Sequence, residues 1–436
     1  MSTSTSVAIH SQLLPQPQLR ASQAVPSSRT NGQSATLASQ GSQSGEEDPR
    51  RRQVLHDVLT ARAEEKEARK RKRNGAPLDP KDTFKLAARI YSRCYSPFIS
   101  LFFCFRVGSV CDINNPTDPT ALLVPDDPQM ENFAYKAFLQ LRPGLVDYFL
   151  NTDQSIDADA MGAVVEMIDD TARSARSDDT TGLKQPGLNY ILLDLTKDDD
   201  PTGELSRSLL AATEKSQRGF NNLLTGKLLC PHRYSDVYAA DPARTCQKFL
   251  TGALPCKASL LPTFLYGGPY NPDDKYEGLL RGPLCVRVYK HIFKGPSTAG
   301  NGMAVNQQNR RKNQAQLMGL QRTTPRTIAY AVVQARHMLN QQADWCIVDD
   351  QFDSNELFDM TVVLLECDET VNTLTRTWIT NTLDWWDRQV FNKGPRSEDH
   401  ARDEGNEGDN DHDEEDDFRA LMAQRRRVDL NNVDHQ

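Results

Sequence analysis

Residues 172–186, ARSARSDDTTGLKQP, hold the side chains best suited to bind an anion. Three cations, Arg173, Arg176 and Lys184, lie close together in this segment, and four Ser and Thr hydroxyl groups lie between them. Fixed cations and hydroxyl donors are the groups that hold a phosphate or a carboxylate in proteins. These three cations are therefore the candidate anion-binding residues of the chain.

Two other interpretations of the same segment remain open. Asp178 and Asp179 offer oxygen ligands of the kind that Mg²⁺ prefers. Alternatively, the Asp pair caps the next helix, and the arginines fix the segment by pairing with carboxylates or helix carbonyl groups. This structural role is favoured, because adjacent carboxylates and closely spaced arginines are common in ordinary loops.

Two histidines are the other candidates for chemistry. His232 follows Cys230, with Cys246 and Cys256 further along the chain, but the paired CxxC or HxxxH spacings of zinc sites are missing. His291 has no Ser, Cys or carboxylate beside it in a recognisable catalytic motif. We therefore assign no catalytic residue, no metal ligand and no cofactor. An enzyme or anion-binding module that uses residues 172–186 and these histidines is the competing class.

The element that must position the anion-binding candidates is the helix before them. Ser155 or Asp157 can cap its amino terminus. Its apolar face follows the i, i+3, i+4, i+7, i+11 spacing of an amphipathic helix, with Met161, Val164, Val165, Ile168 and Ala172. This pattern predicts a helix that ends near Ala172 and then delivers the polar residues on an irregular loop.

The other long elements are also predicted to be helices. Apolar stripes with helical spacing occupy residues 283–293, 324–339, 353–365 and 370–391. Residues 186–283 are dense in Pro and Gly and hold only short apolar runs. The fold class is therefore mainly α, a single multi-helix domain with a loop-rich Pro/Gly/aromatic middle section.

Aromatic residues place this domain between two tails. The chain has no Phe, Trp or Tyr before Phe84 and none between Phe391 and Phe418. Segments without large apolar side chains cannot bury enough surface to offset the entropy of ordering. The predicted order is a disordered Ser/Gln-rich tail (1–45), a charged basic segment that is helical or disordered (46–82), the helical domain (83–392) and an acidic disordered tail (393–436).

Charge is segregated along the chain, although the formal net charge is only −8. An unbroken basic run is formed by Arg69, Lys70, Arg71, Lys72 and Arg73. Such a run serves as a nuclear localisation signal, contacts nucleic-acid phosphates, or is the solvated end of a helix. Import into the nucleus is favoured over a cytoplasmic location, because the run lies in a segment that a receptor can reach.

Compartment and membrane topology follow from composition. Nine cysteines at irregular spacings, without a secretory leader before them, are typical of reduced thiols in a protein that is not secreted. The apolar run at 97–108 is too short to span a bilayer, so we expect no transmembrane segment and no membrane partner.

Several segments, in the same order, resemble the landmarks of an uncharacterised basidiomycete fungal family that is defined only by a domain of unknown function. They are SARSDDTTGLK, RGFNNLLTGKLLCP, YNPDDKYEGLLRGPL, VYKHIFKGPST, TPRTIAYAVVQARHML and TLDWWDRQVF. The resemblance runs from about residue 132 to residue 392 and implies one coherent domain. It transfers no activity and no site residue. The chain departs from the family pattern at 94–111, which is rich in Cys and Phe, and at 303–318.

Taken together, the sequence favours a non-enzymatic intracellular, nuclear binding module whose partner is a protein or a nucleic acid. The alternative is an anion- or phosphate-binding protein or enzyme that uses the SARSDDTTGLK segment. A third class is an interaction protein whose acidic tail imitates or masks a polyanion.

Overall fold

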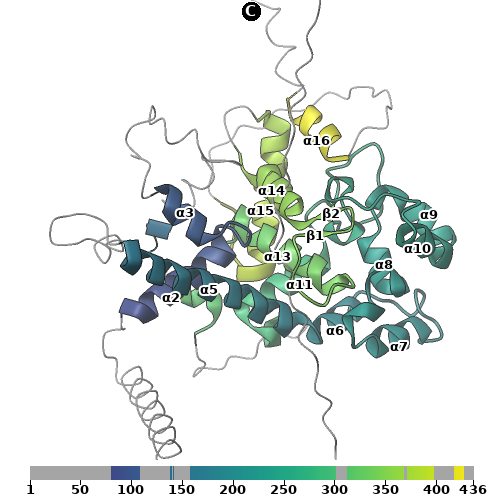
Figure 1. The fold of residues 1–436 in the computed structure, drawn as a ribbon. Coiled ribbons are helices and arrows are strands. Elements are labelled where there is room, and N and C mark those ends of the chain that lie inside the picture. The colour runs from purple at the N-terminus through teal and green to yellow at the C-terminus, as the bar shows by residue number, and fades with distance from the viewer. Residues whose placement is uncertain are drawn as a thin grey trace, which may run out of the picture. The chain divides into compact units, whose positions relative to one another are not determined.

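The structure, a computed structural model, describes residues 80–108, 138–139, 141, 158–300, 312–367, 371–396 and 417–426. All of them belong to one compact unit, Pro77–Gln436. The predicted tail at 1–45 and the basic run at 69–73 lie outside the described residues, as does most of the acidic segment. The described part is mainly helical, as the sequence predicted (Figure 1).

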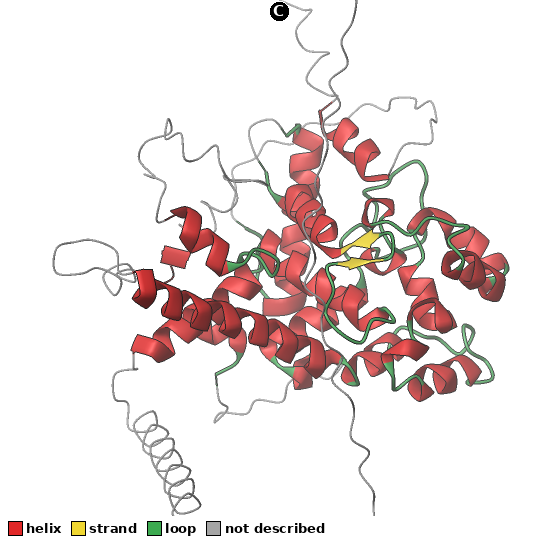
Figure 2. Ribbon diagram, in the orientation of Figure 1, coloured by secondary structure: helices red, strands yellow, loops and turns green. Residues whose placement is uncertain are grey.

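Helices account for nearly all of the regular structure, and a single two-stranded hairpin is the exception among the described residues (Figure 2). The helices are α2 (Pro80–Cys94), α3 (Leu101–Gly108), α5 (Ala158–Leu183), α6 (Pro186–Leu192), α7 (Glu204–Ala211), α8 (Leu223–Leu229), α9 (Ser235–Ala240), α10 (Pro242–Leu250), α11 (Pro283–Tyr289), α12 (Gln314–Leu317), α13 (Pro325–Leu339), α14 (Ser354–Leu365), α15 (Thr373–Phe391) and α16 (Asp417–Arg426). The strands β1 (Val348–Asp349) and β2 (Phe352–Asp353) pair antiparallel, with Asp349 opposite Phe352.

Helix α13 is the centre of the domain. Its amino terminus is fixed because the Thr324 side chain accepts a hydrogen bond from the Thr327 amide and Pro325 occupies the first turn. Every residue from Thr327 to Leu339 is buried, and the helix packs against α2, α5, α11 and α14. A helix that is buried all round has neighbours on every side, so the residues at its end are held firmly.

A second, smaller core lies where α2 and α3 pack against the amino-terminal half of α5. Its buried apolar side chains include Tyr91, Leu101, Phe105, Val165 and Ile168. The carboxylate of Asp169 accepts hydrogen bonds from the Ser100 hydroxyl and the Leu101 amide, which caps the start of α3. The Cys/Phe-rich stretch at 94–111 thus contributes packed residues to this core.

The prediction that the helix before the anion-binding candidates ends near Ala172 was wrong. Helix α5 continues to Leu183, so residues 173–183 are helical and not an irregular loop. The stripe continues beyond Ala172 at helical spacing through the buried Ala175 and Leu183, and the partly buried Asp179 between them interrupts its apolar character. An ion pair with Arg93 of α2 permits a carboxylate at this position, and hydrophobic spacing within α5 does not reveal it.

The middle section between α6 and α11 consists of short α-helices and 3₁₀ turns joined by loops. Helix α16 lies within the segment predicted to be an acidic disordered tail, and it packs on the 3₁₀ turn Ala258–Leu260. The fully buried Leu421 and the ion pairs of Asp417 with Arg233 and Lys275 hold it there. Within the described ranges, no helix has the length and apolar character that crossing a bilayer requires.

Candidate functional site

The three cations predicted to bind an anion are not brought together around one space. Arg173, with 59% of its side chain exposed, pairs with Asp169 and Asp170 on its own helix. Arg176 donates to the Pro97 carbonyl group, and its guanidinium lies 4.7 Å from the centre of the Trp345 ring. Lys184 is exposed just beyond the end of α5. Burial lowers the pKa of Arg176. Anion binding by Arg173, Arg176 and Lys184 stays a prediction.

The neighbouring carboxylates also diverge. Asp179 accepts two hydrogen bonds from Arg93, at 2.7 and 2.8 Å, and one from the Tyr330 hydroxyl at 2.7 Å. Asp178 is exposed and takes part in none of these contacts. Among the described residues, no group of three or more His, Cys, Asp or Glu side chains is placed to hold a metal ion.

The two histidines singled out in the sequence occupy separate environments. The Nδ1 atom of His291 lies 2.9 Å from the Tyr190 hydroxyl, and burial lowers the pKa of His291. His232 is stacked on Tyr266 and lines a cavity that is treated below. The basic run at 69–73 lies outside the described residues.

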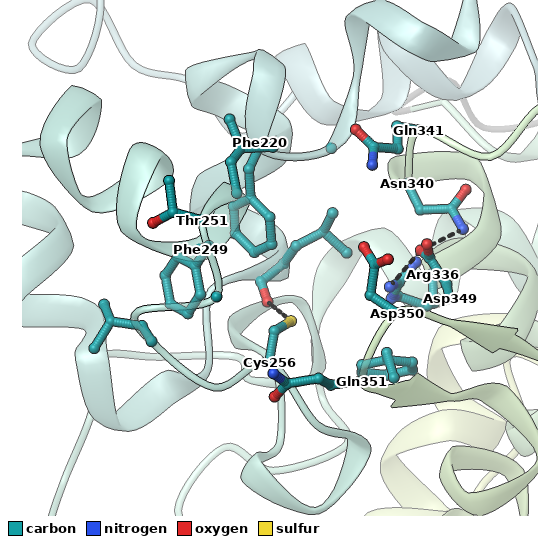
Figure 3. A pocket seen from close by; sticks show the side chains of 16 residues that line it. Phe220, Phe249, Thr251, Cys256, Arg336, Asn340, Gln341, Asp349, Asp350 and Gln351 are labelled. Carbon is teal, nitrogen blue, oxygen red and sulfur yellow. Dashed lines mark hydrogen bonds and ion pairs between the residues drawn. The ribbon is translucent and has the colours of Figure 1, made fainter.

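The site that the structure assembles from several elements is a pocket of about 310 Å³ beside the end of α13 (Figure 3). We call it the polar–aromatic pocket. Its walls come from the 3₁₀ turn Gly219–Asn221, the ends of α8 and α10, the last turn of α13 and the β1–β2 hairpin. Polar side chains gather on the α13 and hairpin side, to which Phe352 also belongs, whereas the aromatic side chains of Phe220 and Phe249 lie on the opposite side.

Asp349 is the fixed charge of the polar wall. Its carboxylate accepts hydrogen bonds from Arg336 Nη2 at 2.9 Å, Asn340 Nδ2 at 3.1 Å and Gln342 Nε2 at 2.8 Å. Burial alone would raise the pKa of Asp349, but Arg336 and the three hydrogen bonds hold it below its usual value. The group is therefore ionised at neutral pH, and its charge is balanced by Arg336.

Asp350 is the uncompensated charge of the same wall. It is exposed at the two-residue turn between β1 and β2, and its side chain has no hydrogen bond or ion pair with any residue that the structure describes. Its φ angle is +55°, in the left-handed region that favours glycine and costs other residues on the order of 1 kcal/mol. This strained turn places the carboxylate beside the open space of the pocket (Figure 3).

The aromatic wall is a stacked pair. The rings of Phe220 and Phe249 are 4.5 Å apart between centroids and 15° from parallel. Phe249 is buried and Phe220 is partly exposed, so Phe220 forms the solvent-facing part of the wall. Below them the Cys256 thiol lies 4.0 Å from the Leu229 carbonyl oxygen.

Two buried basic side chains, Lys215 and Arg218, hold the end of α13, and thereby the polar wall, in place. Lys215 Nζ donates to Asn340 Oδ1 at 2.8 Å and to the carbonyl group of His337. Arg218 is fully buried and donates to the carbonyl oxygens of Met338 at 3.3 Å and Lys184 at 2.7 Å. Arg218 is a cation at the carboxyl terminus of α13, where it satisfies unpaired carbonyl groups and interacts favourably with the helix dipole. Burial and the nearby Arg218 and Arg336 lower the pKa of Lys215 to about 6, so at neutral pH Lys215 holds its partners chiefly as an uncharged hydrogen-bond donor.

Sequence reasoning did not single out any of the pocket's charged residues. Arg336 lies in the segment 324–339, which was predicted to be a helix without a role for this residue, and Asp349 and Asp350 were not weighed. The available signal was the acidic sequence VDDQFD, residues 348–353, in which Asp349 and Asp350 are adjacent and the last residue, Asp353, caps α14. For Lys184 the sequence suggested a role of the side chain in anion binding, whereas in the structure its backbone carbonyl oxygen accepts a hydrogen bond from Arg218.

Comparison with known proteins found a match to one family model. The model of a family of unknown function, DUF6698, matches residues 170–391, slightly more than half of the chain. No curated protein and no solved structure matched significantly. The matched range begins within α5 and includes all the residues of the polar–aromatic pocket.

Proposed function

Because the chain belongs to this family of unknown function, we propose a function from the geometry of its own residues. The protein is a non-enzymatic binding module, and its polar–aromatic pocket takes the cationic side chain of a Lys or Arg in a partner protein.

The proposal depends on the two opposed walls of the pocket. A cation held between aromatic rings and a carboxylate gains both the attraction to the ring faces and the ion pair. Phe220 and Phe249 supply the rings, and Asp350 supplies a carboxylate that no described residue of the domain neutralises. A volume of about 310 Å³ is at the lower end of the range for ligand sites and suits one long side chain.

The same charges favour a protein partner over a nucleic acid. A phosphate group that entered this pocket would meet Asp350, while the nearest cation, Arg336, pairs with Asp349 through Nη2 and stacks over the Phe352 ring. The Nε and Nη1 groups of Arg336 have no hydrogen-bond partner among the described residues, but they are buried behind the polar wall. Anion binding at Arg173, Arg176 and Lys184 is the alternative proposal. It has less support, since the two arginines are bound to groups of the domain.

The state of Cys256 supports binding and not catalysis. Cys256 is the residue of the pocket with the most nucleophilic side chain, and burial raises its pKa to about 11. A thiolate, not a thiol, is the nucleophile, so this residue is unreactive at neutral pH.

The direct test measures binding of fluorescein-labelled decapeptides whose central residue is Arg, Lys, Gln or Glu, by fluorescence anisotropy. We expect the Arg and Lys peptides to bind and the Gln and Glu peptides to bind at least tenfold more weakly, because only a cation satisfies Asp350. Asp350→Asn should weaken the Arg peptide about tenfold, equivalent to about 1.4 kcal/mol.

The matched control is Asp198→Asn, the same substitution at an exposed carboxylate outside the pocket. It should leave the affinity unchanged, since it alters net charge equally without altering the site. Equal affinities for the four peptides, or equal losses for the two variants, would refute the cationic-side-chain proposal.

We further propose that the protein is a fungal, basidiomycete protein that works in the nucleus, with 69–73 as its import signal. The support is the unbroken basic run and the resemblance of the sequence segments. Replacing Arg69, Lys70, Arg71, Lys72 and Arg73 with Gln should move a fluorescent fusion of the full chain from the nucleus to the cytoplasm. An unchanged distribution with an intact circular dichroism spectrum would refute import through this run.

A further inference from the structure

The described residues enclose a second, larger cavity of about 540 Å³ in the middle section. Its walls come from α7, α8, α9 and the loop at 263–270. The lining is mostly apolar and includes Leu195, Leu205, Leu224, Tyr238, Pro269 and Tyr270. Protein interiors are close-packed, and a space of this size has the dimensions of a small-molecule site.

His232 is a buried polar group of this apolar cavity, and one of its two ring nitrogens lacks a hydrogen-bond partner among the described residues. It lies in the 3₁₀ turn His232–Tyr234 with 3% of its surface exposed. The ring stacks on Tyr266, with centroids 3.8 Å apart and planes 12° apart, and meets the edge of Tyr270 at 5.1 Å. These contacts fix the plane of the ring, yet its Nε2 atom has no hydrogen-bond partner among the described residues.

The neighbouring serine determines which ring nitrogen carries the proton. The Ser235 hydroxyl donates its only proton to the His232 carbonyl oxygen, at 2.6 Å. The Ser235 oxygen also lies 3.4 Å from Nδ1 of His232. Because its proton is already donated, this oxygen can only accept a hydrogen bond from Nδ1, so Nδ1 carries the hydrogen. Burial lowers the pKa of His232 to about 4, and a hydrogen bond from the ring N–H to the Pro269 backbone carbonyl group opposes the shift. In the neutral ring, Nε2 is consequently an unprotonated acceptor.

The other polar side chains of the lining do not satisfy this acceptor. The Tyr238 hydroxyl donates to the Leu223 carbonyl oxygen, and the Thr263 hydroxyl donates to the Cys230 carbonyl oxygen at 2.8 Å. Lys227 is exposed at the edge of the cavity. Because buried acceptors are nearly always paired, a donor from outside the chain is the missing partner.

We infer that this cavity binds a small, neutral, mostly apolar molecule that carries one hydroxyl or N–H group and donates from it to His232 Nε2. The cavity volume limits the size of the ligand, the apolar lining favours an apolar ligand surface, and the single unpaired acceptor requires one hydrogen-bond donor on the ligand. This site is separate from the polar–aromatic pocket, with which it shares no lining residue. Either site can therefore be correct if the other is wrong.

The test compares 1-naphthol with 1-methoxynaphthalene, which has the same ring system but no donor, by isothermal titration calorimetry on the full chain. We expect 1-naphthol to bind about tenfold more tightly, because it alone pairs with Nε2. His232→Phe keeps a flat ring against Tyr266 but has no acceptor. In this variant we expect 1-naphthol and 1-methoxynaphthalene to bind with about equal affinity.

A matched pair of variants locates the binding. Ala239 and Ala240 are adjacent, exposed residues of α9, and only Ala239 lines the cavity. Ala239→Trp should fill the entrance and weaken 1-naphthol at least tenfold, whereas Ala240→Trp should leave the affinity within about twofold. Circular dichroism and the thermal midpoint of both variants establish that they are folded.

Three results would overturn the inference. They are no binding of 1-naphthol by the wild-type chain, equal affinities for the two tryptophan variants, and a preference for 1-naphthol that survives in His232→Phe. None of these measurements depends on the peptide affinities that test the proposed function.

Discussion

Replacing Asp179 with Ala should destabilise the domain far more than the same change at its neighbour Asp178. Asp179 joins three helices, because Arg93 of α2 and Tyr330 of α13 both donate to its carboxylate on α5. The Arg93 side chain is only 4% exposed and binds both carboxylate oxygens. Removing the carboxylate leaves this guanidinium buried without a counter-charge.

The magnitude follows from that uncompensated charge. Breaking a buried ion pair by removing one partner typically costs about 3–5 kcal/mol, and the Tyr330 hydroxyl also loses its acceptor. The contact of Arg93 with the Ala175 carbonyl oxygen, at 3.3 Å, remains and recovers a small part. We therefore expect Asp179→Ala to lower the free energy of unfolding by about 3–4 kcal/mol.

Urea unfolding followed by tryptophan fluorescence measures this difference, with Asp178→Ala as the control. Asp178 is exposed, so its loss should change the free energy of unfolding by less than about 0.5 kcal/mol. The double variant Arg93→Met/Asp179→Ala removes the buried charge as well, and should lose less than Asp179→Ala alone. A loss within about 1 kcal/mol of the Asp178 control, or a double variant that is less stable than Asp179→Ala, would refute the reasoning.

Three further predictions concern stability. The folded-state pKa of His232, about 4 against an ordinary 6.5, means that only the unfolded chain takes up a proton between these values. Stability should therefore fall by up to about 3 kcal/mol as pH drops from 6.5 towards 4, and urea midpoints of His232→Phe should show a flatter dependence. Gly282→Ala places a Cβ atom 1.9 Å from a backbone carbonyl oxygen, whereas Gly268→Ala meets nothing within 4 Å. The first should lose about 3 kcal/mol or more in urea unfolding and the second less than about 0.5, and similar losses would contradict the close approach of the two backbone segments at Gly282. Trp386 is fully buried and donates to a carbonyl oxygen at 2.8 Å, so Trp386→Ala should lower the unfolding free energy by about 3–5 kcal/mol, more than Trp385→Ala at a partly exposed position. Equal decreases in thermal midpoint for these two variants would contradict the greater burial of the Trp386 ring.

The helices with uninterrupted apolar stripes were predictable from the sequence. Helix α13 follows its Thr324–Pro325 start signal, and α14 follows the Asp353 cap that accepts from the Asn355 and Glu356 amides. Helix α5 was cut short because one position of its buried face is Asp179. Hydrophobic periodicity treats a carboxylate as solvated, and only the partner helix shows that this one is paired.

The pocket was beyond prediction from sequence for a different reason. Its residues come from segments at 219–229, 249–256 and 336–352, which contact one another only after folding. None of these segments carries a motif with fixed spacing, so no local pattern indicates that Phe249 and Asp350 share a space. Candidate residues were instead chosen by type, and the structure places two of them, Arg173 and Arg176, on one helix, where both contact groups of the domain; anion binding by them stays a prediction.

The two carboxylates of the pocket differ in how far the domain itself binds them. Asp349 is bound by three side-chain donors, one of which, Asn340, is itself held by Lys215 at the end of α13. Its hydrogen-bonding capacity is largely used inside the domain, so it fixes the wall and has little capacity for a ligand. Asp350 follows it directly, in a strained backbone conformation and without a partner among the described residues. Strain at a turn persists only where the surrounding structure enforces it, and here the enforcing contacts are those of Asp349. The internal ion pair with Arg336 thus positions a neighbouring charge that remains available to a cation from another molecule.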